Sequence, residues 1–174
     1  MNFIERLFGG KRSRRQIEPL YRAVVAAGRD KSWYARGGVP DTIDGRFDMI
    51  AAVLALVMLR LEANGEASRD STVLLAETFV DDMEGSLREI GIGDLVVGKH
   101  VGRMMSALGG RLGALREALG NPDELREVVR RNIFHEKPLS EAAVDWVTER
   151  LAAFHIRLQA QGIADLLAGD LPPL

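Results

Sequence analysis

Three carboxylates in residues 38–50, "GVPDTIDGRFDMI", have a spacing that could bind a metal ion. Asp41, Asp44 and Asp48 are three and four residues apart, so they share one face if the segment is helical. Aspartates spaced in this way can hold Mg²⁺ against a diphosphate, as in α-helical enzymes that transfer prenyl groups. A second acidic stretch, "DDMEG" at 81–85, would complete such a site. One hypothesis is therefore a small Mg²⁺-dependent enzyme of isoprenoid or quinone chemistry.

The same segment has a simpler explanation as the start of a helix. Arg46 lies among the acids, and Pro40 and Gly45 make the beginning of the segment irregular. Thr42 or Asp44 can accept the free backbone N–H groups at a helix N-terminus. Helix capping is favoured over a metal site.

A second candidate is the stretch "LREIGIGDL" at residues 87–95, where two glycines interrupt an apolar pattern. Gly91 can adopt the left-handed conformation that ends a helix, and Asp94 can cap the helix that follows. Capping does not account for Arg88 and Glu89. These two charges are either ordinary solvated residues or part of a recognition surface.

Beyond this corner, Gly98, Gly102, Gly109 and Gly113 recur at intervals of four, seven and four residues. They fall on one side of a helix, where a smooth stripe lets another backbone approach closely. Close packing on a neighbouring helix is the favoured explanation. A groove for a bound segment is the alternative.

The first fifteen residues combine an apolar helical face with a basic run. Such a segment can lie on an anionic membrane, where each positive charge contributes about 1 kcal/mol. The basic run could equally contact ribosomal RNA, or the segment could dock on the bundle. The residues concerned are Phe3, Ile4, Leu7, Phe8, Lys11, Arg12, Arg14 and Arg15.

Composition excludes several classes of function. The chain has no cysteine, so disulfides and thiolate metal sites are absent, as suits a reducing compartment. His100, His135 and His155 are not spaced as metal ligands, and no nucleophile motif or phosphate-binding glycine loop occurs. A net charge of −2 gives no general attraction to nucleic acid. The longest apolar run, residues 49–59, is too short to span a bilayer and predicts a core helix.

The periodicity of the apolar residues predicts that helices carry all of these residues. The sequence predicts one all-α domain, a bundle of about six helices at 16–168, preceded by an amphipathic and basic arm at 1–15 and followed by a loose tail at 169–174. A turn-rich connector follows the first helix. The predicted helices cover 14–28, 44–63, 71–90 and 95–119, and two more begin at Pro122 and Glu141.

Two long motifs and a short one resemble the ubiquinol–cytochrome c chaperone family, including its shorter alphaproteobacterial members. The resemblance covers roughly residues 17–120. The matching residues are Val39, Pro40, Asp41, Thr42, Gly45, Arg46 and Phe47, then Met83, Leu87, Arg88, Glu89, Gly91, Gly93, Asp94, Leu95, Val97 and Lys99, and finally Gly110 and Arg111.

The resemblance implies a non-enzymatic factor without cofactors that holds newly made cytochrome b during assembly of the bc1 complex. It further implies a cytoplasmic protein, peripheral on the inner face of the plasma membrane, which meets its client there or near the ribosome exit. No sequence-specific nucleic acid is expected as a partner. The resemblance makes recognition of the client the expected role of Asp41, Arg46, Arg88, Glu89, Asp94, Lys99 and Arg111.

Overall fold

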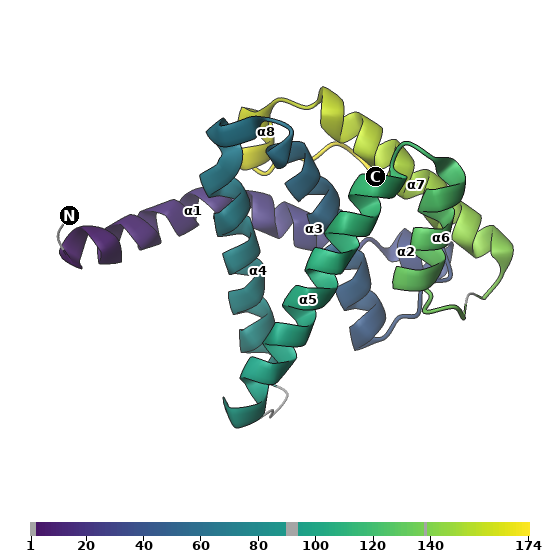
Figure 1. The fold of residues 1–174 in the computed structure, drawn as a ribbon, viewed down its shortest axis with the longest axis horizontal. Coiled ribbons are helices and arrows are strands. Elements are labelled where there is room, and N and C mark those ends of the chain that lie inside the picture. Colours follow the sequence, from purple (N-terminus) through teal and green to yellow (C-terminus); the bar gives the residue numbers. More distant parts are fainter. Residues whose placement is uncertain (1–2, 90–93, 138) are drawn as a thin grey trace.

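The computed structural model describes residues 3–89, 94–137 and 139–174, with residues 3–14, 87, 94 and 95 described by their backbone alone. These residues form helices joined by short loops, and no strand occurs among them (Figure 1). All six predicted helices are present, with two further short helices and one 3-10 turn. In chain order the elements are α1 (Phe3–Gly28), α2 (Lys31–Ala35), α3 (Ile43–Glu62), η1 (Gly65–Ser68), α4 (Arg69–Glu89), α5 (Asp94–Ala118), α6 (Pro122–Asn132), α7 (Glu141–Ala160) and α8 (Ile163–Leu167).

Helix α3 forms the centre of the bundle. Every residue from Met49 to Leu56 is at most 2% exposed, which fits a helix that is apolar on all its sides. Helices α1, α4, α5 and α7 pack around it (Figure 1). The prediction of a core helix at residues 49–59 is therefore confirmed. Across the parts of the chain that the structure describes, no helix is long and apolar enough to cross a membrane.

Polar side chains cap the helices where the sequence predicts. The amide oxygen of Asn121 accepts hydrogen bonds from the backbone N–H groups of the second and third residues of α6. Ser140 caps α7 and Thr42 caps α3, each by accepting from the third residue of its helix. The acidic segment at 38–50 is thus in part a helix start, with Thr42 and not Asp44 as the cap.

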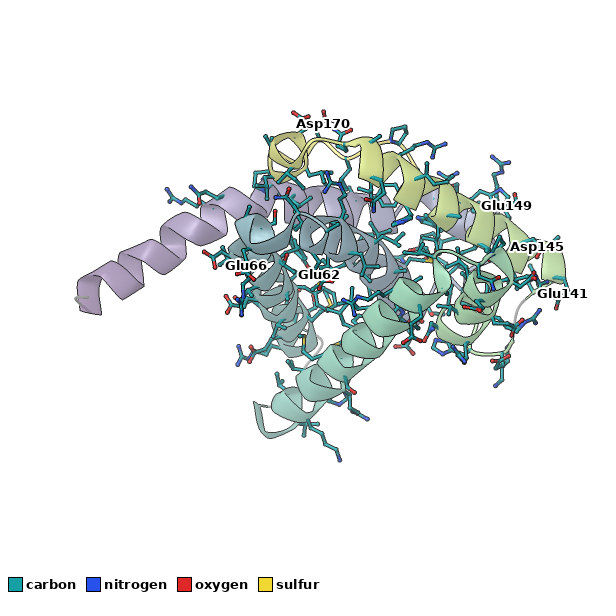
Figure 2. All side chains as sticks on the ribbon, turned by 45° about the horizontal axis from the view of Figure 1, so that its top comes forward. Glu62, Glu66, Glu141, Asp145, Glu149 and Asp170 are labelled. Atoms are coloured by element: carbon teal, nitrogen blue, oxygen red, sulfur yellow. The ribbon has the colours of Figure 1, made fainter. Side chains whose placement is uncertain are left out.

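Exposed ion pairs join α6 to α7. Arg126 Nε lies 2.6 Å from Asp145 Oδ1, and Arg126 and Arg130 both donate to Glu141. Glu141 and Asp145 lie near one another at the start of α7 (Figure 2). The hydrogen bonds from Arg130, and then those from Arg126, lower the pKa of Glu141 to about 2. These contacts orient α7 across α6 more than they stabilise the fold, since exposed ion pairs contribute little.

The connector after α1 is more ordered than its turn-rich sequence predicts, because it contains α2. Trp33 is fully buried, and its indole Nε1 donates to the carbonyl of Ala27 at 2.9 Å. Asp30 accepts from the backbone N–H of Ser32 and caps the helix. A helix of five residues is too short to leave a periodic signal in the sequence.

Within the described residues, the segments predicted as an arm and a tail are both continuous with the helical body. Helix α1 runs without a break from Phe3 to Gly28, so the predicted arm continues directly into the helix that contacts the core. Its first turns extend away from the other helices (Figure 1). In the tail at 169–174, predicted to be loose, Leu171 and Leu174 pack against the core.

The glycine stripe on α5 does not pack against a neighbouring helix, so that prediction is wrong. A Cβ added at Gly98, Gly102, Gly109 or Gly113 would meet no atom of the described residues within 4 Å. Helix α5 contacts the bundle through its other side, where Val97, among others, is buried. Periodicity placed the glycines on one face, but it could not show which face meets a neighbour.

Candidate functional site

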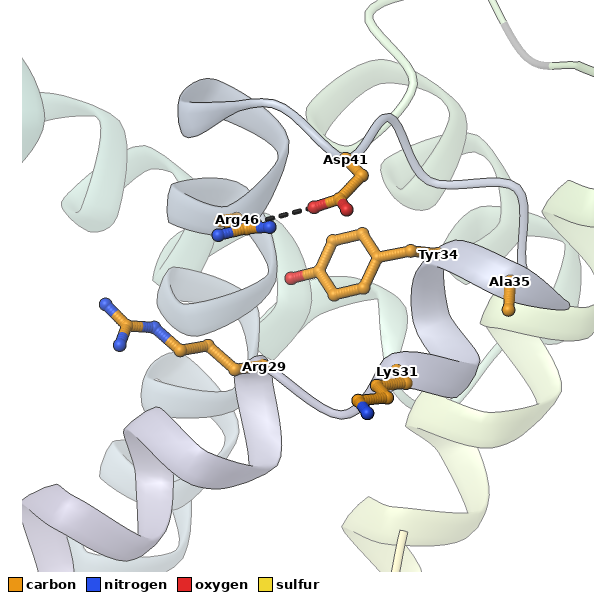
Figure 3. Close-up of a pocket in the computed structure, with 6 residues that line it drawn as sticks. All are labelled: Arg29, Lys31, Tyr34, Ala35, Asp41 and Arg46. Carbon is orange, nitrogen blue, oxygen red and sulfur yellow. Dashed lines mark hydrogen bonds and ion pairs between the residues drawn. The ribbon is translucent and has the colours of Figure 1, made fainter.

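A cavity of about 570 Å³ lies between the end of α1, helix α2 and the first turn of α3 (Figure 3). It carries three cationic side chains and one carboxylate, and it is open to solvent. The segment 38–50 that carries the first family motif forms one side of it. We call this cavity the basic pocket, and it is lined by Arg29, Lys31, Tyr34, Ala35, Asp41 and Arg46.

Two close backbone contacts shape the basic pocket. A Cβ at Gly28 would lie 2.6 Å from the Cα of Ile50, so the end of α1 meets α3 at a distance that only glycine permits. A Cβ at Gly45 would lie 2.0 Å from the carbonyl oxygen of Pro40, which holds the loop before α3 against the helix. Tyr34 donates its hydroxyl to the carbonyl of Gly28 at 2.9 Å. The walls of the pocket are therefore fixed by packed backbone.

The charges of the basic pocket are only partly balanced. Arg46 Nε donates to Asp41 Oδ1 at 2.7 Å, and this hydrogen bond lowers the pKa of the Asp41 carboxyl. Among the described residues, Arg29 and Lys31 form no ion pair. The lining therefore carries an excess of two positive charges in a chain whose net charge is −2.

The chemistry of the basic pocket favours binding. Burial raises the pKa of Tyr34, and the hydroxyl is already donated to the backbone. The carboxylate of Asp41 is held by Arg46, and the lining contains no serine, cysteine or histidine. Cations beside an aromatic ring suit recognition of an anionic group, not proton transfer.

Arg111, predicted to contact a client, lies in the core. Its side chain and that of Asp48 are about 5% and 7% exposed, and Arg111 Nη2 lies 2.7 Å from Asp48 Oδ1 and from the carbonyl of Asn132. His135 Nε2 lies 2.7 Å from Asp48 Oδ2. These contacts tie α5 and the loop after α6 to α3. The expectation of direct contact by Arg111 is corrected, because its guanidinium is enclosed and its Nη2 is bonded within the protein.

The three aspartates of the metal hypothesis do not converge. Asp41 precedes α3 and binds Arg46, Asp44 is exposed, and Asp48 points into the core towards Arg111. No group of three histidines or acidic residues in the described part of the chain could hold a metal ion. The shared face predicted from their spacing does not form, because Asp41 lies outside the helix.

The corner residues lie at the end of the α4–α5 pair, apart from the basic pocket. Arg88 forms an ion pair with Glu84 at 2.8 Å on the same helix. Glu89 and Lys99 are exposed. None of these residues lines the basic pocket, so the predicted recognition residues form two separate groups.

Most of the remaining predicted residues have side chains outside the described part of the chain. The helix stop at Gly91 falls outside the described residues. Arg15 is exposed on α1. The side chains that lie outside the described part are those of Phe3, Ile4, Leu7, Phe8, Lys11, Arg12, Arg14 and Asp94.

The sequence analysis missed Arg29, Lys31 and Tyr34 as pocket residues. A signal was present, since basic and aromatic residues are interleaved in "RDKSWYAR" at 29–36, directly before the first motif. The sequence alone did not show that the end of α1 returns to the start of α3. That contact depends on Gly28 meeting Ile50.

Comparison with known proteins gives two findings. A family model described as ubiquinol-cytochrome C chaperone matches residues 35–171. The crystal structure of the Cbp3 homolog from Brucella abortus is similar to this chain with a TM-score of 0.81 and 28% sequence identity, covering 99% of this chain and 97% of that one. A search of curated proteins gave no match.

Proposed function

The chain belongs to the ubiquinol–cytochrome c chaperone family, and we propose that it holds newly made cytochrome b while the bc1 complex is assembled. Membership confirms the resemblance found in the sequence motifs. It makes the protein a non-enzymatic assembly chaperone of the bc1 complex, with a client protein in that pathway. The hypothesis of a Mg²⁺-dependent isoprenoid or quinone enzyme is therefore wrong.

The basic pocket is the observation that supports client binding at a particular place. The first family motif forms one side of it, and its chemistry suits the binding of a polar group. We assign client recognition in this pocket to Asp41 and Arg46. Apolar burial would supply affinity, and charged groups would set the orientation of the client. A second contact at the α4–α5 corner would involve Arg88, Glu89, Asp94 and Lys99.

Crosslinking in cells tests this function. A photo-crosslinking amino acid at Ala35, on the rim of the basic pocket, and another at Arg88 are expected to capture cytochrome b. The same group at Ile156, which is 69% exposed on α7, is the matched control and is expected to capture none. Deletion of the gene is expected to lower assembled bc1 complex without changing the cytochrome b transcript. Normal bc1 levels in the deletion strain, or capture of cytochrome b from position 156 alone, would contradict the proposal.

We further propose that the start of α1 contacts the anionic membrane surface on which the client is inserted. The first turns of α1 extend away from the other helices, which leaves room for such a contact (Figure 1). Apolar residues would enter the interface, and the basic run would meet lipid headgroups. The residues assigned are Phe3, Ile4, Leu7, Phe8, Lys11, Arg12, Arg14 and Arg15.

Liposome flotation tests the membrane contact. The full chain is expected to float with vesicles that contain phosphatidylglycerol and to stay at the bottom with phosphatidylcholine alone. A chain that lacks residues 1–15 is expected to lose flotation with the phosphatidylglycerol vesicles. Equal flotation of the two chains would contradict the proposal. If the truncation instead removes co-sedimentation with ribosomes, the segment contacts the ribosome exit region.

A further inference from the structure

We propose that the basic pocket binds a carboxylate on an acidic segment of the client, and that Asp41 occupies the place of this carboxylate until the client arrives. The inference rests on the proposed function, because it assumes a polypeptide client. It adds the chemistry of the recognised segment, two binding residues, Arg29 and Lys31, and a role for Asp41.

The first argument comes from the charges. Arg29 and Lys31 line the pocket without an ion pair among the described residues, and Asp41 neutralises only Arg46. Two positive charges thus remain in a pocket of a chain that is weakly acidic as a whole. An anionic ligand is the complementary occupant, since opposite potentials across an interface give specificity and faster association.

The second argument comes from the exposure of the ion pair. The side chains of Asp41 and Arg46 are 57% and 56% exposed. An ion pair in this much solvent contributes little stability, so a second carboxylate can exchange with Asp41 at small cost. Asp41 also precedes the first helical residue of α3, so its side chain can turn away without unwinding the helix.

The third argument comes from the shape of the pocket. The ring of Tyr34 lies between Asp41 and Lys31, with its hydroxyl end towards Arg46 and Arg29 (Figure 3). Because that hydroxyl is bound to the backbone, the ring offers an apolar wall beside the cations. The volume of about 570 Å³ is within the usual range of ligand sites and exceeds what one carboxylate needs. The remaining space fits a neighbouring apolar or aromatic side chain of the same segment.

Binding of a model peptide to the full chain tests the inference. The probe is a fluorescein-labelled hexapeptide of alternating glutamate and tyrosine, and the comparison peptide has glutamine in place of glutamate. Fluorescence anisotropy is expected to show roughly tenfold tighter binding of the acidic peptide, the scale of one hydrogen bond to a charged group. Lys31→Gln and Arg46→Gln are each expected to weaken binding by a similar factor. Asp41→Asn is expected to strengthen it several-fold.

Arg69→Gln is the matched control, since Arg69 is an exposed arginine at the start of α4 and lies outside the basic pocket. It is expected to leave binding unchanged. Equal affinity for both peptides would overturn the inference, and so would weaker binding by Asp41→Asn, which would make Asp41 a ligand contact. Loss of phosphatidylglycerol vesicle binding in Lys31→Gln, without loss of peptide binding, would assign the pocket to a lipid headgroup and also overturn it.

The outcome for the inference can be separated from the outcome for the proposed function. Capture of cytochrome b from position 35, together with failure of the acidic peptide to bind, would leave the chaperone proposal in place and overturn only the acidic segment. Peptide binding with no capture of cytochrome b would support an acidic ligand and contradict the client assignment.

Discussion

Arg111→Met is expected to lower the free energy of unfolding by about 3–5 kcal/mol, the usual effect of breaking a buried ion pair. The substitution leaves the carboxylate of Asp48 in the core without the guanidinium that lies 2.7 Å away. It also removes the donor to the carbonyl of Asn132. Urea denaturation followed by circular dichroism would measure the change.

The double variant Asp48→Leu/Arg111→Met is the decisive comparison. It removes both charges. Replacing a buried ion pair by apolar residues often leaves the free energy of unfolding unchanged or raises it. It is expected to be more stable than Arg111→Met alone, which keeps the test valid even if the single variant does not fold. Arg116→Met is the surface control, since its partner Glu62 is exposed, and it is expected to cost roughly 1 kcal/mol or less. A loss in Arg111→Met no greater than in Arg116→Met would contradict the buried role.

The helices could be predicted because their signals are local. Asn121 and Ser140 cap their helices through residues two or three positions away, and such patterns are present in the sequence itself. The apolar run at 49–59 is buried because a helix that is apolar on all its sides has no polar face that could remain exposed to solvent. Fold class and helix positions therefore followed from periodicity and capping.

The site was only half predictable, because its other half depends on contacts distant in sequence. Asp41 and Arg46 were identified through the family motif, but Arg29 joins them only where Gly28 meets Ile50. Arg111 matched the same family, yet its partner Asp48 is 63 positions away, and nothing local shows that the pair is buried.

The same limit explains why two interpretations based on spacing fail: the metal site, which was the less favoured alternative, and the close packing of the glycines, which was the favoured one. The intervals of three and four residues between Asp41, Asp44 and Asp48 suggested one shared helix face, but the helix begins at Ile43, which leaves Asp41 outside it. The glycines of α5 do share a face, but within the described part of the chain no neighbouring helix meets that face. Spacing determines which residues lie together on a helix. Packing determines which side of the helix is covered.

Gly45→Ala is expected to destabilise the protein by roughly 1–3 kcal/mol, the usual effect of overpacking. The new Cβ would lie 2.0 Å from the carbonyl oxygen of Pro40 and 3.1 Å from its carbonyl carbon. Both are backbone atoms, so the loop itself must move. Alanine favours a helix over glycine by about 1 kcal/mol, which makes a net loss at this position a sign of the steric contact. Thermal and urea denaturation would measure it.

Gly102→Ala supplies the control with the opposite expected sign. No atom of the described residues lies within 4 Å of a Cβ at that position, so the higher helix propensity of alanine is the main effect. The free energy of unfolding is expected to rise by roughly 0.5–1 kcal/mol. The two variants are also expected to differ in their binding of the acidic peptide. Movement of the Pro40 loop would separate Asp41 from Arg46 and reshape the basic pocket, so Gly45→Ala is expected to alter acidic-peptide binding while Gly102→Ala leaves it unchanged. Equal stability changes in the two variants would show that Gly45 does not hold the loop against α3, and the pocket would then need another explanation for its shape.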